Sequence, residues 1–228
     1  MTKARRKIEL ALLCLWKCYE IPTNFGIISL RTTVNPSYMI MKGRFSMTGY
    51  IALLRGINVG GNNKISMPEL KKAFEAQGFM NVVTYINSGN VIFDSCLDES
   101  AAQAACETLI ESGFGLKIAV GIISAAELRD ALAHAPDWWN SDPESKHNAI
   151  FVIQPMTAET VCALIGEIKP EYEKIAYHGK VIYWSAPFAT FSRTRLTKIV
   201  HSKTINNSIT VRNANTALKL AALTGETE

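Results

Sequence analysis

The chain has 228 residues, of which 48% are hydrophobic, and a formal net charge of +4 at neutral pH. This hydrophobic content is enough for a folded core and excludes a largely disordered chain. Residues 1–46 carry eight basic and two acidic residues, a net charge of +6, whereas residues 47–228 carry 16 basic and 18 acidic residues, a net charge of −2. Overall charge is therefore a weak argument for nucleic-acid binding.

Residues 1–46 are interpreted as a doubtful leader. Residues 3–7 are mostly basic and residues 10–16 are apolar, a pattern that imitates a signal peptide. The apolar run follows Glu9, is too short to span a bilayer, and is not followed by a small-residue cleavage site. Met47 stands just before the first convincing strand, so we expect translation to start there or at Met41.

The first half of the remaining chain alternates strand and helix patterns. Residues 50–55 form an apolar strand, a glycine-rich loop follows, and Ser66 and Pro68 mark the start of a helix over 67–77. The later patterns predict strands over 82–86, 91–93 and 116–120, and helices over 99–112 and 125–133. The order βαββαβ is that of a ferredoxin-like domain. Right-handed crossovers place its first and third strands side by side.

Residues 136–147 are predicted to be a linker, polar apart from Trp138 and Trp139. Beyond the linker the first pattern repeats, with predicted strands over 148–153, 174–177, 181–184 and 209–211 and helices over 157–168, 192–201 and 213–223. The two hairpins look related, with Gly89 and Gly179 in corresponding positions. We therefore predict an α+β protein of two tandem ferredoxin-like subdomains with mainly antiparallel sheets, residues 47–135 (with a connecting helix) and 148–228.

Cysteines and histidines give no sign of a metal or catalytic motif. The five cysteines (14, 18, 96, 106 and 162) include no CxxC pair, and the four histidines (134, 147, 178 and 201) are scattered. Reduced thiols in a cytoplasmic protein are the favoured interpretation. No metal, cofactor or membrane partner is predicted.

Four sequence motifs together resemble a known family. They are Arg55-Gly56-Ile57-Asn58-Val59-Gly60-Gly61; Tyr85-Ile86-Asn87-Ser88-Gly89-Asn90-Val91; Ser192-Arg193 with Leu196 and Lys198; and Thr210-Val211-Arg212-Asn213-Ala214-Asn215-Thr216. They are similar to the DUF1697 family of bacterial proteins of unknown function, over about residues 47–225. The resemblance implies two ferredoxin-like subdomains and a start near Met47, but no established activity, cofactor or catalytic residue. The family usually has Trp where this chain has Ala214.

Four segments collect small polar and basic residues, and we predict that they bind a ligand. Their members are Arg55, Asn58, Gly60, Gly61, Asn62 and Lys64; Asn87, Ser88, Gly89 and Asn90; Ser192, Arg193 and Lys198; and Arg212, Asn213 and Asn215. Glycine-rich loops and helix N-termini present N–H groups to anions. The competing interpretation is that the glycines supply turns, Ser192 and Asn213 cap helices, and the charges are solvated.

The favoured function is binding of a small phosphate- or carboxylate-bearing ligand, with Arg193 and Arg212 as a clamp. The sequence does not decide whether catalysis follows, although His178 is the best acid–base candidate. It also leaves the oligomeric state open.

Two other functions remain open from the sequence. The first is a single-stranded nucleic-acid-binding module, in which aromatic side chains would stack on bases. Core packing is the stronger explanation for most of the aromatic candidates, which are Tyr85, Phe93, Tyr177, Tyr183 and Trp184. The second is a protein-interaction domain that uses Trp138 and Trp139, although a plug between the two subdomains is favoured for this pair.

Overall fold

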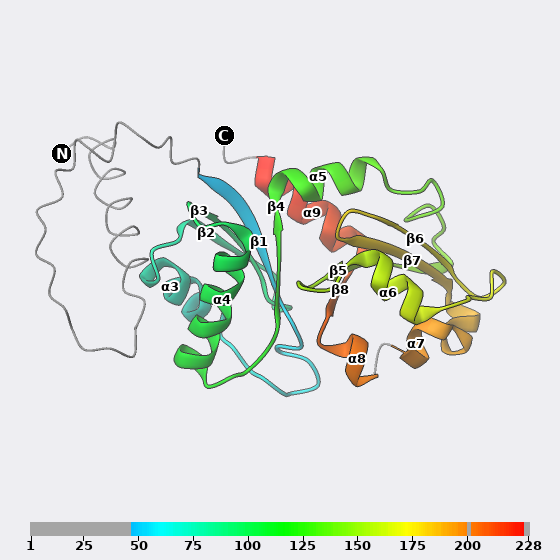
Figure 1. The fold of residues 1–228 in the computed structure, drawn as a ribbon, viewed down its shortest axis with the longest axis horizontal. Coiled ribbons are helices and arrows are strands. Elements are labelled where there is room, and N and C mark those ends of the chain that lie inside the picture. The colour runs from blue at the N-terminus through cyan, green and yellow to red at the C-terminus, as the bar shows by residue number, and fades with distance from the viewer. Residues whose placement is uncertain (1–46, 200–201, 226–228) are drawn as a thin grey trace, which may run out of the picture.

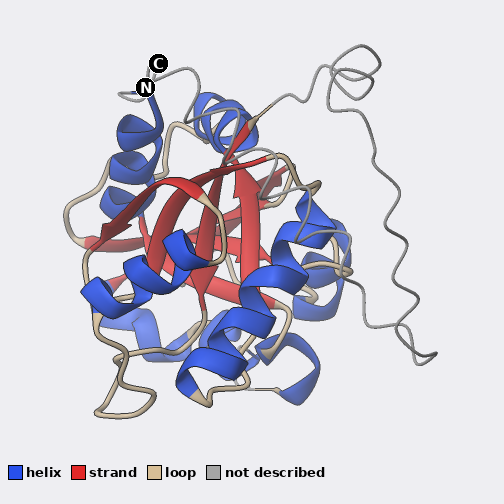
Figure 2. Ribbon diagram, turned by 90° about the vertical axis from the view of Figure 1, so that its left-hand side faces the viewer, coloured by secondary structure: helices blue, strands red, loops and turns tan. Residues whose placement is uncertain are grey.

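The computed structural model describes residues 47–199 and 202–225, and the leader expected in residues 1–46 lies outside these ranges. In the described part, strands occupy the interior and helices cover the outside (Figure 1, Figure 2). The protein is α+β, with two four-stranded antiparallel sheets. No helix of the described ranges is long and apolar enough to cross a membrane.

The first half of the described chain forms one sheet and three helices. Its elements are β1 (Thr48–Leu54), α3 (Met67–Ala76), β2 (Met80–Tyr85), β3 (Asn90–Ser95), α4 (Glu99–Phe114), β4 (Val120–Ser124) and α5 (Ala125–Ala133). The strand order is β2-β3-β1-β4, so β1 and β3 lie side by side as right-handed crossovers predict. Local signals fix the helix ends: the Asp98 carboxylate accepts from the N–H of Ala101, and Ser124 begins α5 with a capping box.

Strand β4 differs from the sequence prediction of a strand over 116–120. Leu54 is the last residue of β1, and it pairs with Val120. Residues before Val120 therefore have no partner strand on β1, although Leu116 and Ile118 still pack against the core. The apolar pattern of residues 116–120 correctly predicted packing against the core, but not that the strand pairing with β1 begins only at Val120.

The second half repeats the strand order of the first, as β6-β7-β5-β8. Its elements are β5 (Ser145–Val152), α6 (Ala158–Ile165), β6 (Lys174–His178), β7 (Val181–Pro187), the 3-10 helix η1 (Phe188–Arg193), α7 (Arg195–Ile199), α8 (Lys203–Asn206), β8 (Ile209–Asn213) and α9 (Ala214–Gly225). Neighbouring strands are again antiparallel.

The helix predicted over 192–201 is divided in the structure, and residues 200 and 201 lie outside the described ranges. Ser192 lies within η1, and Thr194 has an extended backbone between η1 and α7. The buried carboxylate of Glu173 accepts hydrogen bonds from the backbone N–H groups of Arg195 and Leu196. Because Glu173 lies more than 20 residues before α7, the local sequence pattern could not predict where this helix begins.

Strand alternation divides the apolar side chains among three cores. In β1, Tyr50, Ala52 and Leu54 face α3 and α4, whereas Ile51 and Leu53 face the second sheet. The central core, between the sheets, also contains residues of α5 and α9 together with Trp139. The third core lies on the outer face of the second sheet, against α6 and α7. Both faces of each sheet are therefore covered.

Polar contacts also join the two halves at α5 and the β6–β7 turn. Lys180 in this turn forms ion pairs with Glu99 of α4 and, at 2.7 Å, with Glu127 of α5. The hydroxyl of Tyr183 in β7 donates to the carbonyl of Ala131 in α5. Burial, with a smaller effect of the Asp130 charge, raises the pKa of Tyr183 to about 12, so this hydroxyl keeps its proton at physiological pH.

The ion pair between Lys180 and Glu127 predicts a pH dependence of stability. Burial opposes the charge on Glu127, but hydrogen bonds from Lys180 and Ser124 outweigh it and lower the pKa below 4.5. Burial lowers the pKa of Lys180, but the hydrogen bonds that it donates to Glu127 and Glu99 outweigh this effect and raise the pKa above 10.5. The ion pair therefore stabilises the folded protein at pH values between about 4.5 and 10.5. This stabilisation is lost in acid, as the pH falls through the lowered pKa of Glu127.

We expect Glu127→Gln to lower the free energy of unfolding near neutral pH and to match the wild type once the pH is well below 4.5. Urea unfolding at a series of pH values measures this difference. The control is Glu75→Gln, because Glu75 pairs with Lys71 at 3.9 Å on the exposed face of α3 and should contribute little. A difference between wild type and Glu127→Gln that persists in acid would contradict the assignment.

Candidate functional site

The glycine-rich loop, residues 56–64, leads from β1 to α3 at the lower edge of the molecule in Figure 1. The N–H of Asn62 donates to the carbonyl of Val59 at 3.0 Å and closes a tight turn. Gly60 and Gly61 form its centre with φ values of 59° and 81°. A Cβ atom on either glycine would meet nothing within 4 Å, so backbone conformation alone explains these two glycines.

Asn58 holds this loop against the β2–β3 hairpin turn. Its amide nitrogen donates to the carbonyls of Ile65 (3.0 Å) and Asn87 (2.9 Å), and its amide oxygen accepts from the N–H of Ile65 (2.9 Å). The loop and the hairpin turn, two of the four predicted segments, are therefore joined by one side chain. Lys64 is exposed beside them.

The hairpin turn, residues 86–89, packs closely on the end of β1. The buried side chain of Asn90 donates to the carbonyl of Tyr85 and to the hydroxyl of Ser88, each at 3.0 Å. Gly89 has a φ of 76°, and a Cβ atom on it would lie 2.8 Å from side-chain atoms of Leu54 and Ile57. The conformation and the close approach both require glycine at this position.

Arg212 of β8 crosses from the second half to this hairpin turn. It is 7% exposed, and its Nε donates to the side-chain oxygen of Asn90 at 2.5 Å. Its Nη2 donates to the carbonyls of Leu54, Ser88 and Gly89, and its Nη1 to Thr210 and the carbonyl of Val211. Burial lowers the pKa of Arg212 to about 10, which leaves the guanidinium charged at neutral pH.

Arg55 makes the reciprocal contact from the end of β1. Its Nε donates to the carbonyl of Ile209 at 3.2 Å, and its Nη2 donates to the side-chain oxygen of Asn206. Burial lowers the pKa of Arg55 as well. Among the described residues, neither Arg55 nor Arg212 forms an ion pair with a carboxylate.

Two hollows lie on either side of the glycine-rich loop. The first, which we call the junction hollow, has a volume of about 220 Å³ and is lined by Arg55, Gly56, Ile57, Val59, Ser88, Ile209, Thr210, Val211 and Arg212. The second, the loop hollow, is more open, has a volume of about 410 Å³ and is lined by Asn58, Gly61, Lys64, Ile65, Ser66, Met67 and Asn87. Both arginines of the reciprocal contact therefore line the junction hollow.

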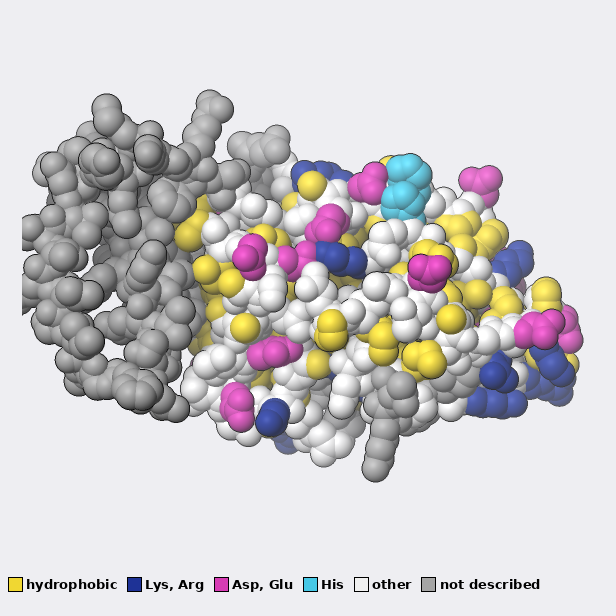
Figure 3. All heavy atoms as spheres, viewed as in Figure 1, with side chains coloured by type: hydrophobic (Ala, Val, Ile, Leu, Met, Phe, Trp, Pro, Cys, Tyr) yellow, Lys and Arg dark blue, Asp and Glu magenta, His cyan; other side chains and the backbone are white. Residues whose placement is uncertain are grey.

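The remaining predicted site residues lie elsewhere. Ser192 and Arg193 belong to η1 and Lys198 to α7, at the end of the molecule where Figure 3 shows Lys and Arg side chains gathered. The guanidinium of Arg193 lies 5.9 Å from the centre of the Tyr172 ring. Asn213 caps α9, since its side-chain oxygen accepts from the N–H of Thr216 at 2.7 Å, and Asn215 is exposed on α9.

Aromatic side chains offer little to a base-stacking surface. Phe93, Tyr183 and Trp184 are at most 4% exposed and pack in the cores, whereas Tyr177 is 48% exposed. Trp139 is buried in the central core, where its ring nitrogen donates to the carbonyl of Asn148 at 2.9 Å. This position fits the interpretation of a plug between the two halves.

Sequence reasoning missed Asn206 and Thr210, which hold the two arginines. Asn206 is a polar residue just before the short predicted strand over 209–211, and Thr210 lies within that strand and within the fourth family motif, but neither was predicted as a site residue.

These features define an α+β protein in which two four-stranded antiparallel sheets meet at a junction that contains two arginines. The chain belongs to the family described as "Protein of unknown function (DUF1697)", whose model matches residues 47–183, so the predicted family is confirmed. A solved structure of a conserved bacterial protein, SP0830 from Streptococcus pneumoniae, is 28% identical with a TM-score of 0.70. The match covers 78% of this chain and 98% of that chain.

An unknown protein from Galdieria sulphuraria is 10% identical with a TM-score of 0.21, over 74% of this chain and 98% of that chain. This similarity is too low to support any conclusion. No curated protein matches the chain.

Proposed function

We propose that the protein binds a small anionic ligand, bearing a phosphate or carboxylate group, in the junction hollow. The observation that carries this proposal is the pair of guanidinium groups, Arg55 and Arg212, that line one hollow without a carboxylate partner among the described residues. Removing a cation from water is unfavourable, and an anion bound beside it offsets that penalty.

Arg55 is the side chain through which the ligand would bind. Arg212 already directs Nε, Nη1 and Nη2 to protein acceptors, so it contributes mainly a fixed positive charge. Arg55 is less buried, and its Nη1 has no hydrogen-bond partner among the described residues. Ser88 and Thr210 also line the hollow, and their hydroxyls accept hydrogen bonds from Asn90 and Arg212, respectively.

The size of the junction hollow restricts the ligand class. Its volume of about 220 Å³ is below the roughly 300 Å³ at which sites for drug-sized ligands begin. A phosphate or carboxylate on a small organic body therefore suits it better than a long single-stranded nucleic acid. We propose binding and assign no catalytic residue.

Thermal unfolding in the presence of inorganic phosphate, pyrophosphate and citrate tests the proposal. We expect at least one of these anions to raise the melting temperature of the full chain, and Arg55→Gln to weaken its binding about 10- to 100-fold. Lys64→Gln is the matched control, since Lys64 lines the loop hollow and not the junction hollow.

Two results would reject the site. If the anion no longer stabilises Lys64→Gln but still stabilises Arg55→Gln, the binding site is the loop hollow and not the junction hollow. If none of the three anions stabilises the wild type, the proposal that the protein binds a small anion is rejected.

We also infer that the two halves are tandem ferredoxin-like units that arose by duplication. The support is the identical strand order of the two sheets and the helix, α5 or α9, that follows the last strand of each. We also propose a cytoplasmic location, with which the absence of a disulfide among Cys96, Cys106 and Cys162 in the described residues is consistent.

A further inference from the structure

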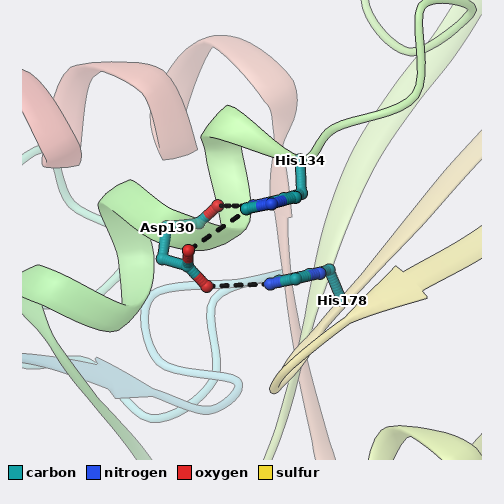
Figure 4. Close-up of side chains that lie close together, drawn as sticks. All are labelled: Asp130, His134 and His178. Carbon is teal, nitrogen blue, oxygen red and sulfur yellow. Dashed lines mark hydrogen bonds and ion pairs between the residues drawn. The ribbon is translucent and has the colours of Figure 1, made fainter.

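Asp130, His134 and His178 meet on the surface above the central core, although the sequence separates His178 from the other two (Figure 4). Asp130 and His134 lie one turn apart at the end of α5, and His178 ends β6. One ligand atom from each residue can be chosen so that all three lie within 4.8 Å of one another. The cluster therefore combines one residue of the second half with two of the first.

The two imidazole rings present nitrogen atoms to the same carboxylate. Nε2 of His178 lies 2.8 Å from Oδ2 of Asp130, and Nδ1 of His134 lies 3.4 Å from Oδ1. The rings are stacked, with centroids 4.1 Å apart and an angle of 1° between their planes. In Figure 4 both nitrogens point toward the carboxylate, so the donor atoms already face a common region.

These separations suit a transition-metal ion. Zinc binds imidazole nitrogen and carboxylate oxygen at about 2.0–2.2 Å, which puts two ligands of a tetrahedral ion about 3.3 Å apart. The measured separations, 2.8 Å from His178 to Oδ2 and 3.4 Å from His134 to Oδ1, lie on either side of this value. Because they end on different oxygens of Asp130, the carboxylate must either rotate to offer one oxygen to the ion or bind it with both. The rings must tilt away from parallel so that both lone pairs converge, and His134 must give up its 2.9 Å contact with the carbonyl of Asp130.

We propose that Asp130, His134 and His178 form a binding site for a divalent first-row transition ion such as Zn²⁺. Two imidazoles and one carboxylate are ligands that select such ions over Mg²⁺ and Ca²⁺, which prefer oxygen ligands alone. Water completes the coordination, because the three side chains are between 37% and 60% exposed.

Metal binding at this site joins the two halves of the molecule. The same helix, α5, already receives a hydrogen bond from Tyr183 through Ala131, next to Asp130, so the ligands lie on a supported element. Figure 3 shows histidine side chains exposed on the edge where α5 lies. The glycine-rich loop lies at the opposite edge in Figure 1, so this site is separate from the junction hollow and does not depend on the proposed anion binding.

Zinc titration of the full chain, free of any histidine tag and first treated with a chelator, tests the proposal. Isothermal titration calorimetry is expected to show a site whose dissociation constant rises about tenfold or more in His178→Gln. Zn²⁺ should also raise the melting temperature of the wild type more than that of this variant, whereas Mg²⁺ should shift neither.

His178→Gln is informative because a glutamine amide can still donate to Asp130 but cannot replace an imidazole ligand. His134→Ala should weaken zinc binding in the same way. The matched control is His147→Gln, since His147 contacts Ser185 and the carbonyl of Asp142 outside the cluster. Absence of zinc binding to the wild type, or equal zinc affinity in wild type and His178→Gln, would overturn the proposal.

Discussion

Arg212→Met is expected to lower the free energy of unfolding by about 3–5 kcal/mol, because it leaves buried acceptors without donors. The carbonyls of Leu54, Ser88 and Gly89 and the side-chain oxygen of Asn90 all accept hydrogen bonds from this guanidinium. Methionine has a similar length and keeps much of the packing, so the loss reports mainly the missing donors. Urea unfolding of both proteins measures the difference.

Arg212→Lys separates the charge of this side chain from its geometry. Lysine keeps the positive charge but lacks the planar fork that reaches Asn90 and the carbonyls at the same time. We expect it to be less stable than the wild type and more stable than Arg212→Met. Equal stability of Arg212→Met and wild type would show that the contacts of Arg212 do not hold the junction together.

Gly89→Ala is expected to lower the free energy of unfolding by more than about 3 kcal/mol, since it combines two penalties. The φ of 76° disfavours any residue with a Cβ atom, and that atom would lie 2.8 Å from the Cβ of Leu54 and from Ile57. The neighbouring atom of Leu54 is fixed to the backbone of β1, so it cannot move aside without moving the strand. Thermal or urea unfolding measures the loss.

Gly61→Ala isolates the conformational part of this effect. Gly61 has a similar φ of 81°, but its added Cβ atom would meet nothing within 4 Å. We expect a loss of about 1 kcal/mol there, the usual difference for a left-handed residue. If the two alanine variants lose the same stability, close packing of Gly89 against Leu54 is not significant.

Sequence patterns were sufficient for the family, the α+β class and most element positions. Apolar periodicity reports which residues are buried, and Asp98, Ser124 and Thr157 mark the starts of helices by their own side chains. The patterns failed where a distant partner decides the outcome. The end of β1 at Leu54 sets the start of β4, and Glu173 sets the start of α7.

The candidate site was predictable as a set of segments but not as a set of contacts. The loop after β1, the β2–β3 turn and β8 come together, and these contain eleven of the predicted residues, from Arg55 to Asn213. Composition could not distinguish a basic residue that faces a hollow from one that holds the chain together. It also could not show that Ser192, Arg193 and Lys198 belong to η1 and α7, or that His178 meets Asp130.

The contacts of Arg212 impose an order on the maturation of the chain during synthesis. Ribosomes release the N-terminal half first, so Leu54, Ser88 and Gly89 are made more than 120 residues before the side chain that binds their carbonyls. Until β8 and α9 emerge, water must serve these acceptors, and the central core lacks Ala214, Ala217 and Leu220 of α9. The first half therefore completes the hydrogen bonds of its own β2–β3 turn only after Arg212 of β8 has left the exit tunnel.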